Sequence, residues 1–180
     1  CCSVSFYQYV APIRIAILTV IQERGKQHKP IERVYKLLFN REFYLNAYAK
    51  LYPNNGAMTK GVTEETVDGM SIQKIDRMIE LLREEKYQWK PARREYIPKK
   101  NAKKRPLGIP TWGDKLLQEV MREILEAYYE PQFSTHSHGF RPNRGCHTAL
   151  QEIQVWKGTR WFIEGDISKY FDTIDHAVLL

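Results

Sequence analysis

The apolar positions of the chain recur at helical spacing in three stretches. Residues 31–51 have such a pattern, so we expect one helix there. Ser71 is placed to cap a second helix that runs to about Glu84. The strongest pattern follows Asp114, the expected N-cap of a helix that continues to about Tyr129 and packs in the core.

The most apolar run of the chain, residues 10–21, is too short to cross a bilayer. It contains 12 residues, one of which is Arg14, whereas about 20 apolar residues are needed. We therefore expect no membrane partner and a buried helix around residues 13–21. A signal peptide is disfavoured, because no basic segment precedes the run and no small-residue cleavage pattern follows it.

The remaining patterns predict a mixture of strands and helices. Short apolar segments at 97–98 and 106–110 flank a basic stretch and are typical of a β-hairpin. Further along, residues 136–142 predict a loop, 147–156 a short helix and 160–167 a strand. Because strands and helices do not alternate strictly, the predicted fold class is α+β, helix-rich with a basic β-hairpin.

Positive charge is concentrated in one segment. The formal net charge is +7, yet residues 86–105 alone contain nine Lys or Arg and one acid, which leaves −1 for the other 160 residues. Tyr87, Trp89 and Tyr96 alternate with these bases. Aromatic rings among cations suit stacking on bases beside phosphate contacts, so we expect a polyanion such as RNA to bind here. The alternative is a charge run that only faces solvent.

Composition limits the class of protein. Hydrophobic residues make up 43% of the 180 residues, which excludes wholesale disorder. Three cysteines are too few for a disulfide scaffold, which favours a reduced, intracellular compartment. The chain opens on Cys1 and stops at Leu180 within an apolar pattern, so we expect it to be a piece of a longer protein.

The acidic carboxyl-terminal end is the chemically most suggestive part. Asp166 ends an apolar run and follows Gly165, which has no side chain to obstruct a ligand. A carboxylate at such a place is stabilised by a cation, and Mg²⁺ prefers oxygen ligands. A helix cap or an ion pair is the alternative for Asp166. Asp175 precedes another apolar run and is expected to be a helix N-cap, and Phe171 taken alone fits a core position.

Two other metal chemistries fit the residues less well. Four candidate zinc ligands fall close together: His136, His138, Cys146 and His147. Their spacing matches no established zinc pattern. A magnesium-dependent nuclease would use three carboxylates: Asp166, Asp172 and Asp175. No general base can be placed beside them.

Five blocks of the sequence resemble, in the same order, those of the group II intron-encoded reverse transcriptases, the maturases. The blocks are residues 55–61 (NGAMTKG), 93–99 (RREYIPK), 104–110 (KRPLGIP), 137–150 (SHGFRP with RGCHTAL) and 164–176 (EGDISKYFDTIDH). Each block alone is a weak pattern, whereas the ordered set across residues 31–180 is specific.

The resemblance implies the fingers subdomain and the start of the palm of a right-hand polymerase. The expected parts are an amino-terminal extension with an unassigned helix (1–30), a helical extension block of the fingers (31–92), fingers with the basic hairpin and core helix (93–147), and the beginning of the palm (148–180). The implied location is the bacterial cytoplasm or an organelle matrix.

The resemblance also implies roles for particular residues. Asp166, the first catalytic aspartate, and the main-chain carbonyl of Ile167 would hold Mg²⁺. Lys99 and Arg105 would grip the incoming triphosphate, and Phe171 would exclude a ribose 2′-hydroxyl. The expected RNA-binding residues are Arg93, Arg94, Lys100, Lys103, Lys104 and Arg141, the last near the template.

The implied function of the full-length protein is to copy RNA into DNA and to bind its intron RNA for splicing and mobility. Its partners would be group II intron RNA, an RNA template with a DNA primer, and deoxynucleoside triphosphates, with a homodimer left open. The family's paired-aspartate motif is absent from these 180 residues, so we expect the fragment alone not to polymerise. The alternative is a non-catalytic RNA-binding module that assists splicing.

Overall fold

The computed structural model describes the main chain of residues 7–98, 104–168 and 170–179. It also describes the side chains of these residues, except those of 7–12, 171, 172, 176 and 179. The chain forms two compact units, Cys1–Phe133 and Ser134–Leu180, which are described separately. Within the described residues, no helix is both long and apolar enough to cross a bilayer. The structure is helix-rich with one small antiparallel sheet, which is compatible with the predicted α+β class.

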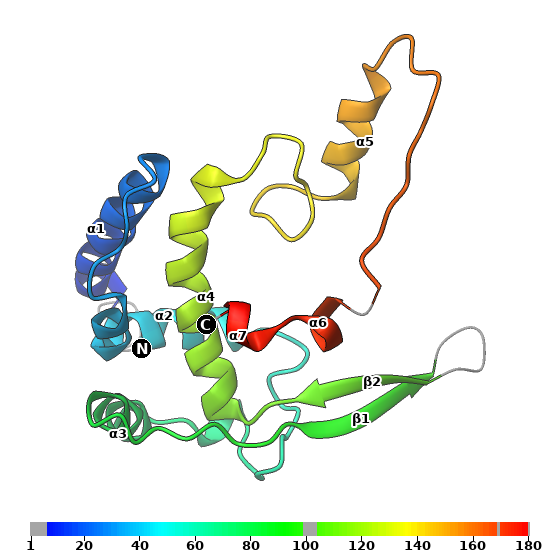
Figure 1. The fold of residues 1–180 in the computed structure, drawn as a ribbon. Helices are drawn as coiled ribbons and strands as arrows, with labels where there is room; N and C mark the ends of the chain where they lie inside the picture. The colour runs from blue at the N-terminus through cyan, green and yellow to red at the C-terminus, as the bar shows by residue number, and fades with distance from the viewer. Residues whose placement is uncertain (1–6, 99–103, 169, 180) are drawn as a thin grey trace. The chain divides into compact units, whose positions relative to one another are not determined.

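The first unit is built around one long helix, α4 (Figure 1). The α-helices of this unit are α1 (Tyr7–Lys26), α2 (Arg41–Leu51), α3 (Ile72–Arg83) and α4 (Trp112–Tyr129), and its 3₁₀ helices are η1 (Val34–Phe39), η2 (Val67–Gly69) and η3 (Glu130–Gln132). Helix α4 packs against α1 and α2. Its buried stripe, Leu116, Leu117, Val120 and Ile124, confirms the predicted core helix.

Helix α1 is only half buried. Ile21 is buried in the core and Ile17 packs against it, whereas Ile13 and Val20 are each 59% exposed. The predicted helix is therefore confirmed, and it is buried along one face. The helix approaches the end of α4 closely at Gly25, where an added Cβ would lie 2.1 Å from the carbonyl oxygen of Tyr128. Only glycine fits this crossing.

The single helix predicted over residues 31–51 is wrong. The structure has the 3₁₀ helix η1, a break at Asn40 and then α2. Asn40 is extended (φ −89°, ψ 114°), and its side chain accepts a hydrogen bond from the backbone N–H of Glu42 at 2.9 Å. A side chain that caps a new helix competes with continuing the old one, which explains the break.

The predicted caps had different outcomes. Ser71 accepts from the N–H of Lys74 at 3.3 Å and begins α3, as predicted. Helix α4 begins three residues earlier than predicted, because its N-cap is Thr111, whose hydroxyl accepts from the N–H of Asp114. Asp114 as the N-cap is therefore wrong, and its carboxylate lies buried inside the first turn.

The predicted basic hairpin is confirmed. Strand β1 (Arg93–Pro98) pairs antiparallel with β2 (Lys104–Ile109), from Arg93 opposite Ile109 to Pro98 opposite Lys104. In Figure 1 the two strands extend away from the helices of their unit. Most of their residues are exposed, so pairing and the contacts at the base of the hairpin hold this element in place.

The second unit contains the helices α5 (Cys146–Gln154), α6 (Tyr170–Thr173) and α7 (His176–Leu179). Asp175 accepts from the N–H of Ala177 at 2.8 Å, which confirms the predicted cap of α7. The strand predicted over 160–167 is wrong: these residues have no regular structure, with Trp161 87% and Ile163 94% exposed. A strand needs a partner to satisfy its backbone, and no strand occurs among residues 134–179 as described.

Candidate nucleotide and nucleic-acid site

The loop that contains Lys60 and Gly61 packs against the base of the hairpin. Arg93 donates from Nε to the carbonyl of Lys60 at 3.1 Å, and its guanidinium also pairs with Glu95. An added Cβ at Gly61 would lie 2.8 Å from the carbonyl oxygen of Pro110, so the loop backbone touches the end of β2 directly. Arg93, predicted to bind RNA, is thus already engaged in holding the hairpin to this loop.

A buried carboxylate joins the main chain just before the hairpin to helix α4. Asp114 accepts hydrogen bonds from the hydroxyls of Thr111 (2.6 Å) and Tyr87 (2.7 Å) and from the main-chain N–H of Lys90 (3.3 Å). Burial and then the bond to Asp114 raise the pKa of Tyr87, so its phenol stays protonated and donates. The main chain that enters β1 is therefore fixed to the first turn of α4.

The other hairpin cations that the structure describes face solvent. Arg94, Lys104 and Arg105 are exposed, and their side chains make no hydrogen bond or ion pair with another described residue. Lys99, Lys100 and Lys103 lie outside the described residues. Exposed guanidinium and ammonium groups bind phosphate through charge-assisted hydrogen bonds, so the three exposed side chains suit contact with a nucleic acid or a nucleotide.

Asp166 lies in the exposed segment before α6. Its neighbour Gly165 has no atom within 4 Å of where a Cβ would stand, so nothing obstructs the main chain here. Asp166 and Ile167 are both exposed and adjacent, and they offer one carboxylate and one main-chain carbonyl. The described side chains form no group of three His, Cys, Asp or Glu that could hold a metal.

These two oxygens fit part of a magnesium site. Mg²⁺ in proteins is usually held by one or two carboxylates together with water and substrate phosphates, so a complete protein cage is not required. The side chain of Phe171, the predicted sugar gate, lies outside the described residues. Asp166 belongs to the second unit and Arg105 to the first, and their sharing of one site stays a prediction.

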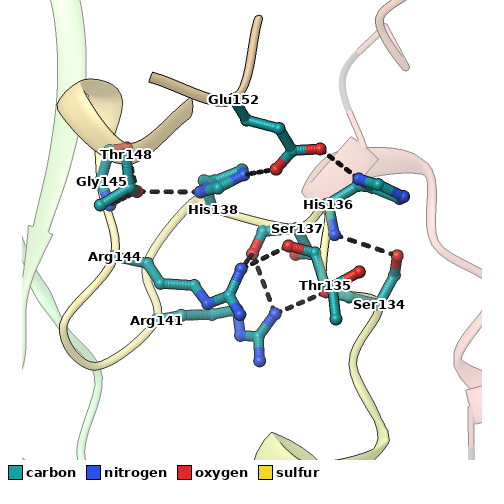
Figure 2. A network of polar contacts seen from close by, with 10 residues as sticks. All are labelled: Ser134, Thr135, His136, Ser137, His138, Arg141, Arg144, Gly145, Thr148 and Glu152. Atoms are coloured by element: carbon teal, nitrogen blue, oxygen red, sulfur yellow. Dashed lines mark hydrogen bonds and ion pairs between the residues drawn. The ribbon is translucent and has the colours of Figure 1, made fainter. Parts of the chain in front are cut away.

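The loop before α5 is organised by two arginines (Figure 2). Arg141 donates from Nη1 to the carbonyls of Ser134 (2.7 Å) and Ser137 (2.9 Å), and Arg144 donates to the carbonyl of Thr135. Charged donors on main-chain carbonyls fold the loop back on itself. Arg141 is predicted to lie near the template. In the structure it also stabilises the fold of this loop through its hydrogen bonds to Ser134 and Ser137.

Helix α5 is tied to the same loop by two histidines, as Figure 2 shows. His138 contacts Glu152 through Nε2 at 2.7 Å and Thr148 through Nδ1 at 2.8 Å, and His136 contacts the other oxygen of Glu152. These hydrogen bonds, first that of His136 and then that of His138, lower the pKa of Glu152. Sequence reasoning did not find this network, because His136 and His138 lie 16 and 14 residues before Glu152 and share no periodic pattern with it.

Replacing Glu152 by glutamine is expected to loosen this loop. The variant loses the charge that both histidines contact, so amide hydrogens of residues 134–145 should exchange faster, roughly threefold at neutral pH. The lowered pKa of Glu152 means that its stabilisation is present above about pH 4.3, the usual glutamate value, and is lost as the pH falls through the lowered pKa.

Hydrogen exchange at neutral and acidic pH checks this expectation. Wild type and variant should differ at neutral pH and converge in acid, and Glu164→Gln, which removes the charge of an exposed glutamate outside this network, should match wild type. Equal exchange of the two proteins at neutral pH would contradict the structural role of Glu152.

Comparison with known proteins identifies the family. A profile described as "Reverse transcriptase (RNA-dependent DNA polymerase)" matches residues 97–180. The chain is 49% identical over 170 residues, 92% of its length, to the group II intron-encoded protein LtrA of Lactococcus lactis. The chain belongs to the group II intron-encoded reverse transcriptases. The predicted resemblance is thereby confirmed.

Two eukaryotic relatives extend this family assignment. An uncharacterized 91 kDa protein in the cob intron of Schizosaccharomyces pombe is 50% identical over 165 residues, 89% of the chain. The nuclear intron maturase 1, mitochondrial, of Arabidopsis thaliana is 40% identical over 72 residues, 39% of the chain. The chain spans only 28%, 20% and 10% of the lengths of LtrA and these two relatives, so it corresponds to one segment of each of these proteins.

Proposed function

We propose that this chain is the fingers and the beginning of the palm of a full-length protein that copies RNA into DNA and binds its group II intron RNA. The match of 92% of the chain to an intron-encoded protein carries this proposal, together with the reverse-transcriptase profile over residues 97–180. The proposed boundaries are 30/31, 92/93 and 147/148. The proposed location is the bacterial cytoplasm or an organelle matrix, where such introns are spliced.

The proposed catalytic residue is Asp166, with the carbonyl of Ile167 as a second ligand to Mg²⁺. The exposed position of both residues and the open space at Gly165 support this role. Bound Mg²⁺ supplies charge stabilisation for in-line displacement at the triphosphate. The described residues hold one candidate ligand carboxylate there, so we expect the segment alone not to polymerise.

The proposed nucleotide-binding residues are Lys99, Arg105 and Phe171. Arg105 presents an exposed guanidinium on β2, and no side chain among the described residues neutralises it. Its planar fork suits bidentate contact with a triphosphate, whereas Lys99 would act as a point charge. Phe171 would lie under the sugar and reject a 2′-hydroxyl.

The basic hairpin is the proposed RNA grip. Replacing Lys100, Lys103 and Lys104 by alanine in the full-length protein is expected to weaken intron RNA binding about 10- to 100-fold. Each lost phosphate contact should lower the slope of log affinity against log salt by about 0.7 to 0.9, which gives about two to three for the triple variant.

Filter binding of labelled intron RNA across a salt series measures both quantities. A matched triple variant of α3, Lys74→Ala with Arg77→Ala and Arg83→Ala, removes the same charge from a helix and should bind nearly as wild type. Unchanged affinity and slope in the hairpin variant would mean that the hairpin is not the RNA grip.

A further inference from the structure

The register of the hairpin sorts its side chains onto two faces. Residues directly opposite each other in an antiparallel pair share a face, and successive residues of a strand point to opposite faces. The Arg105 face consists of Arg93, Glu95, Ile97, Arg105, Leu107 and Ile109. The Tyr96 face consists of Arg94, Tyr96, Pro98, Lys104, Pro106 and Gly108.

The two faces differ in chemistry. On the Arg105 face, the Arg93–Glu95 ion pair neutralises one base, and Ile97, Leu107 and Ile109 form an apolar strip. The Tyr96 face has no acid and two exposed cations, Arg94 and Lys104. The proposed triphosphate residue Arg105 therefore lies on the opposite side of the sheet from these two cations.

The ring of Tyr96 is available for stacking. It is 56% exposed and lies directly opposite Pro106, while Gly108, opposite Arg94, places no side chain beside it. Arg94 is two residues before Tyr96 on the same strand, and Lys104 on β2 is the diagonal neighbour of Tyr96. An aromatic ring between two cations is the arrangement that binds a base together with its flanking phosphates.

The other aromatics of the basic segment are already engaged. The hydroxyl of Tyr87 donates to Asp114, and the ring of Trp89 packs edge-on against Tyr87. Neither residue belongs to the hairpin strands. Among the aromatic residues of this segment, Tyr96 is therefore the one that combines an open ring with cations on both sides.

We propose that the Tyr96 face is a binding site for single-stranded RNA, separate from the site of the incoming nucleotide. A base stacks on the ring of Tyr96, and the adjacent phosphates contact Arg94 and Lys104. This proposal refines the RNA-binding part of the proposed function by assigning RNA to one face of the hairpin. Double-stranded RNA is excluded from this contact, because its bases are stacked within the helix.

The test separates stacking from charge in the full-length protein. Binding of a short single-stranded RNA is measured by fluorescence anisotropy across a salt series. Tyr96→Ile, which keeps strand propensity without a ring, should weaken binding about tenfold with an unchanged salt slope. Tyr96→Phe should bind as wild type, and Arg94→Ala should weaken binding and lower the slope by about 0.7.

Nucleotide kinetics and a duplex competitor complete the test. With saturating template and primer, Tyr96→Ile should leave the KM for deoxynucleoside triphosphate within twofold of wild type, whereas Arg105→Ala should raise it about tenfold. Unchanged RNA affinity in Tyr96→Ile, an increase of its nucleotide KM matching that of Arg105→Ala, or equal competition by duplex RNA overturns the proposal. The anisotropy arm needs no DNA synthesis, so failure of the polymerase assignment would be seen separately, as a wild type that incorporates no nucleotide.

Discussion

Replacing Asp166 by asparagine in the full-length protein is expected to reduce DNA synthesis on an RNA template at least about a thousandfold. The substitution keeps the size and the exposed position of the side chain and removes the charge that would hold Mg²⁺. A thousandfold loss corresponds to about 4 kcal/mol of transition-state stabilisation, which is within the range for a lost electrostatic contact at a reacting phosphate.

Primer extension and RNA binding must be measured on the same preparations. Glu164→Gln removes the same charge from the same exposed segment, and it should retain synthesis within about threefold of wild type. Both variants should bind intron RNA with wild-type affinity. Substantial synthesis by the Asp166 variant would show that this carboxylate is not the catalytic metal ligand.

The largest expected effect on stability is that of Asp114→Ala. The substitution leaves the hydroxyls of Thr111 and Tyr87 and the N–H of Lys90 without the acceptor they share. Buried polar groups that lose a charged partner cost about 3–5 kcal/mol together. Because this carboxylate joins α4 to the main chain entering β1, both elements should loosen.

Hydrogen exchange of α4 amides in the full-length protein measures this loss. A decrease of about 3 kcal/mol in the free energy of opening corresponds to exchange more than a hundredfold faster. The exposed control Asp76→Asn removes a carboxylate that pairs with Arg41 and should cost less than about 1 kcal/mol. Tyr87→Phe, which removes a single hydrogen bond, should fall between them, and unchanged exchange in Asp114→Ala would contradict the anchoring role.

Local patterns predicted the elements whose causes are local. The apolar stripe of α4, the Ser71 cap and the hairpin all follow from residues within one element or one turn. The cap at Thr111 also had a local signal, since Thr111 and Asp114 have the spacing of a capping box. The sequence prediction placed the cap at Asp114 instead of Thr111, because an acid is favoured both at the N-cap and in the first turn of a helix.

The failures have causes that are not local. Asn40 interrupts the helical pattern of 31–51 because its side chain caps α2, although the apolar spacing continues across it. The strand predicted at 160–167 depends on a partner strand that an apolar run alone does not specify. Similarly, the Glu152 network depends on a loop that returns to α5, which no periodicity encodes.

Magnesium binding at Asp166 is the central claim, and metal-directed cleavage tests it most directly. Fe²⁺ that replaces Mg²⁺ in the full-length protein, with ascorbate and peroxide, produces hydroxyl radicals that cut the main chain beside the bound ion. We expect cuts next to Asp166 and Ile167 that disappear with excess Mg²⁺ and in Asp166→Asn but persist in Glu164→Gln. Cuts that leave this segment intact, or that survive in Asp166→Asn, would contradict the assignment.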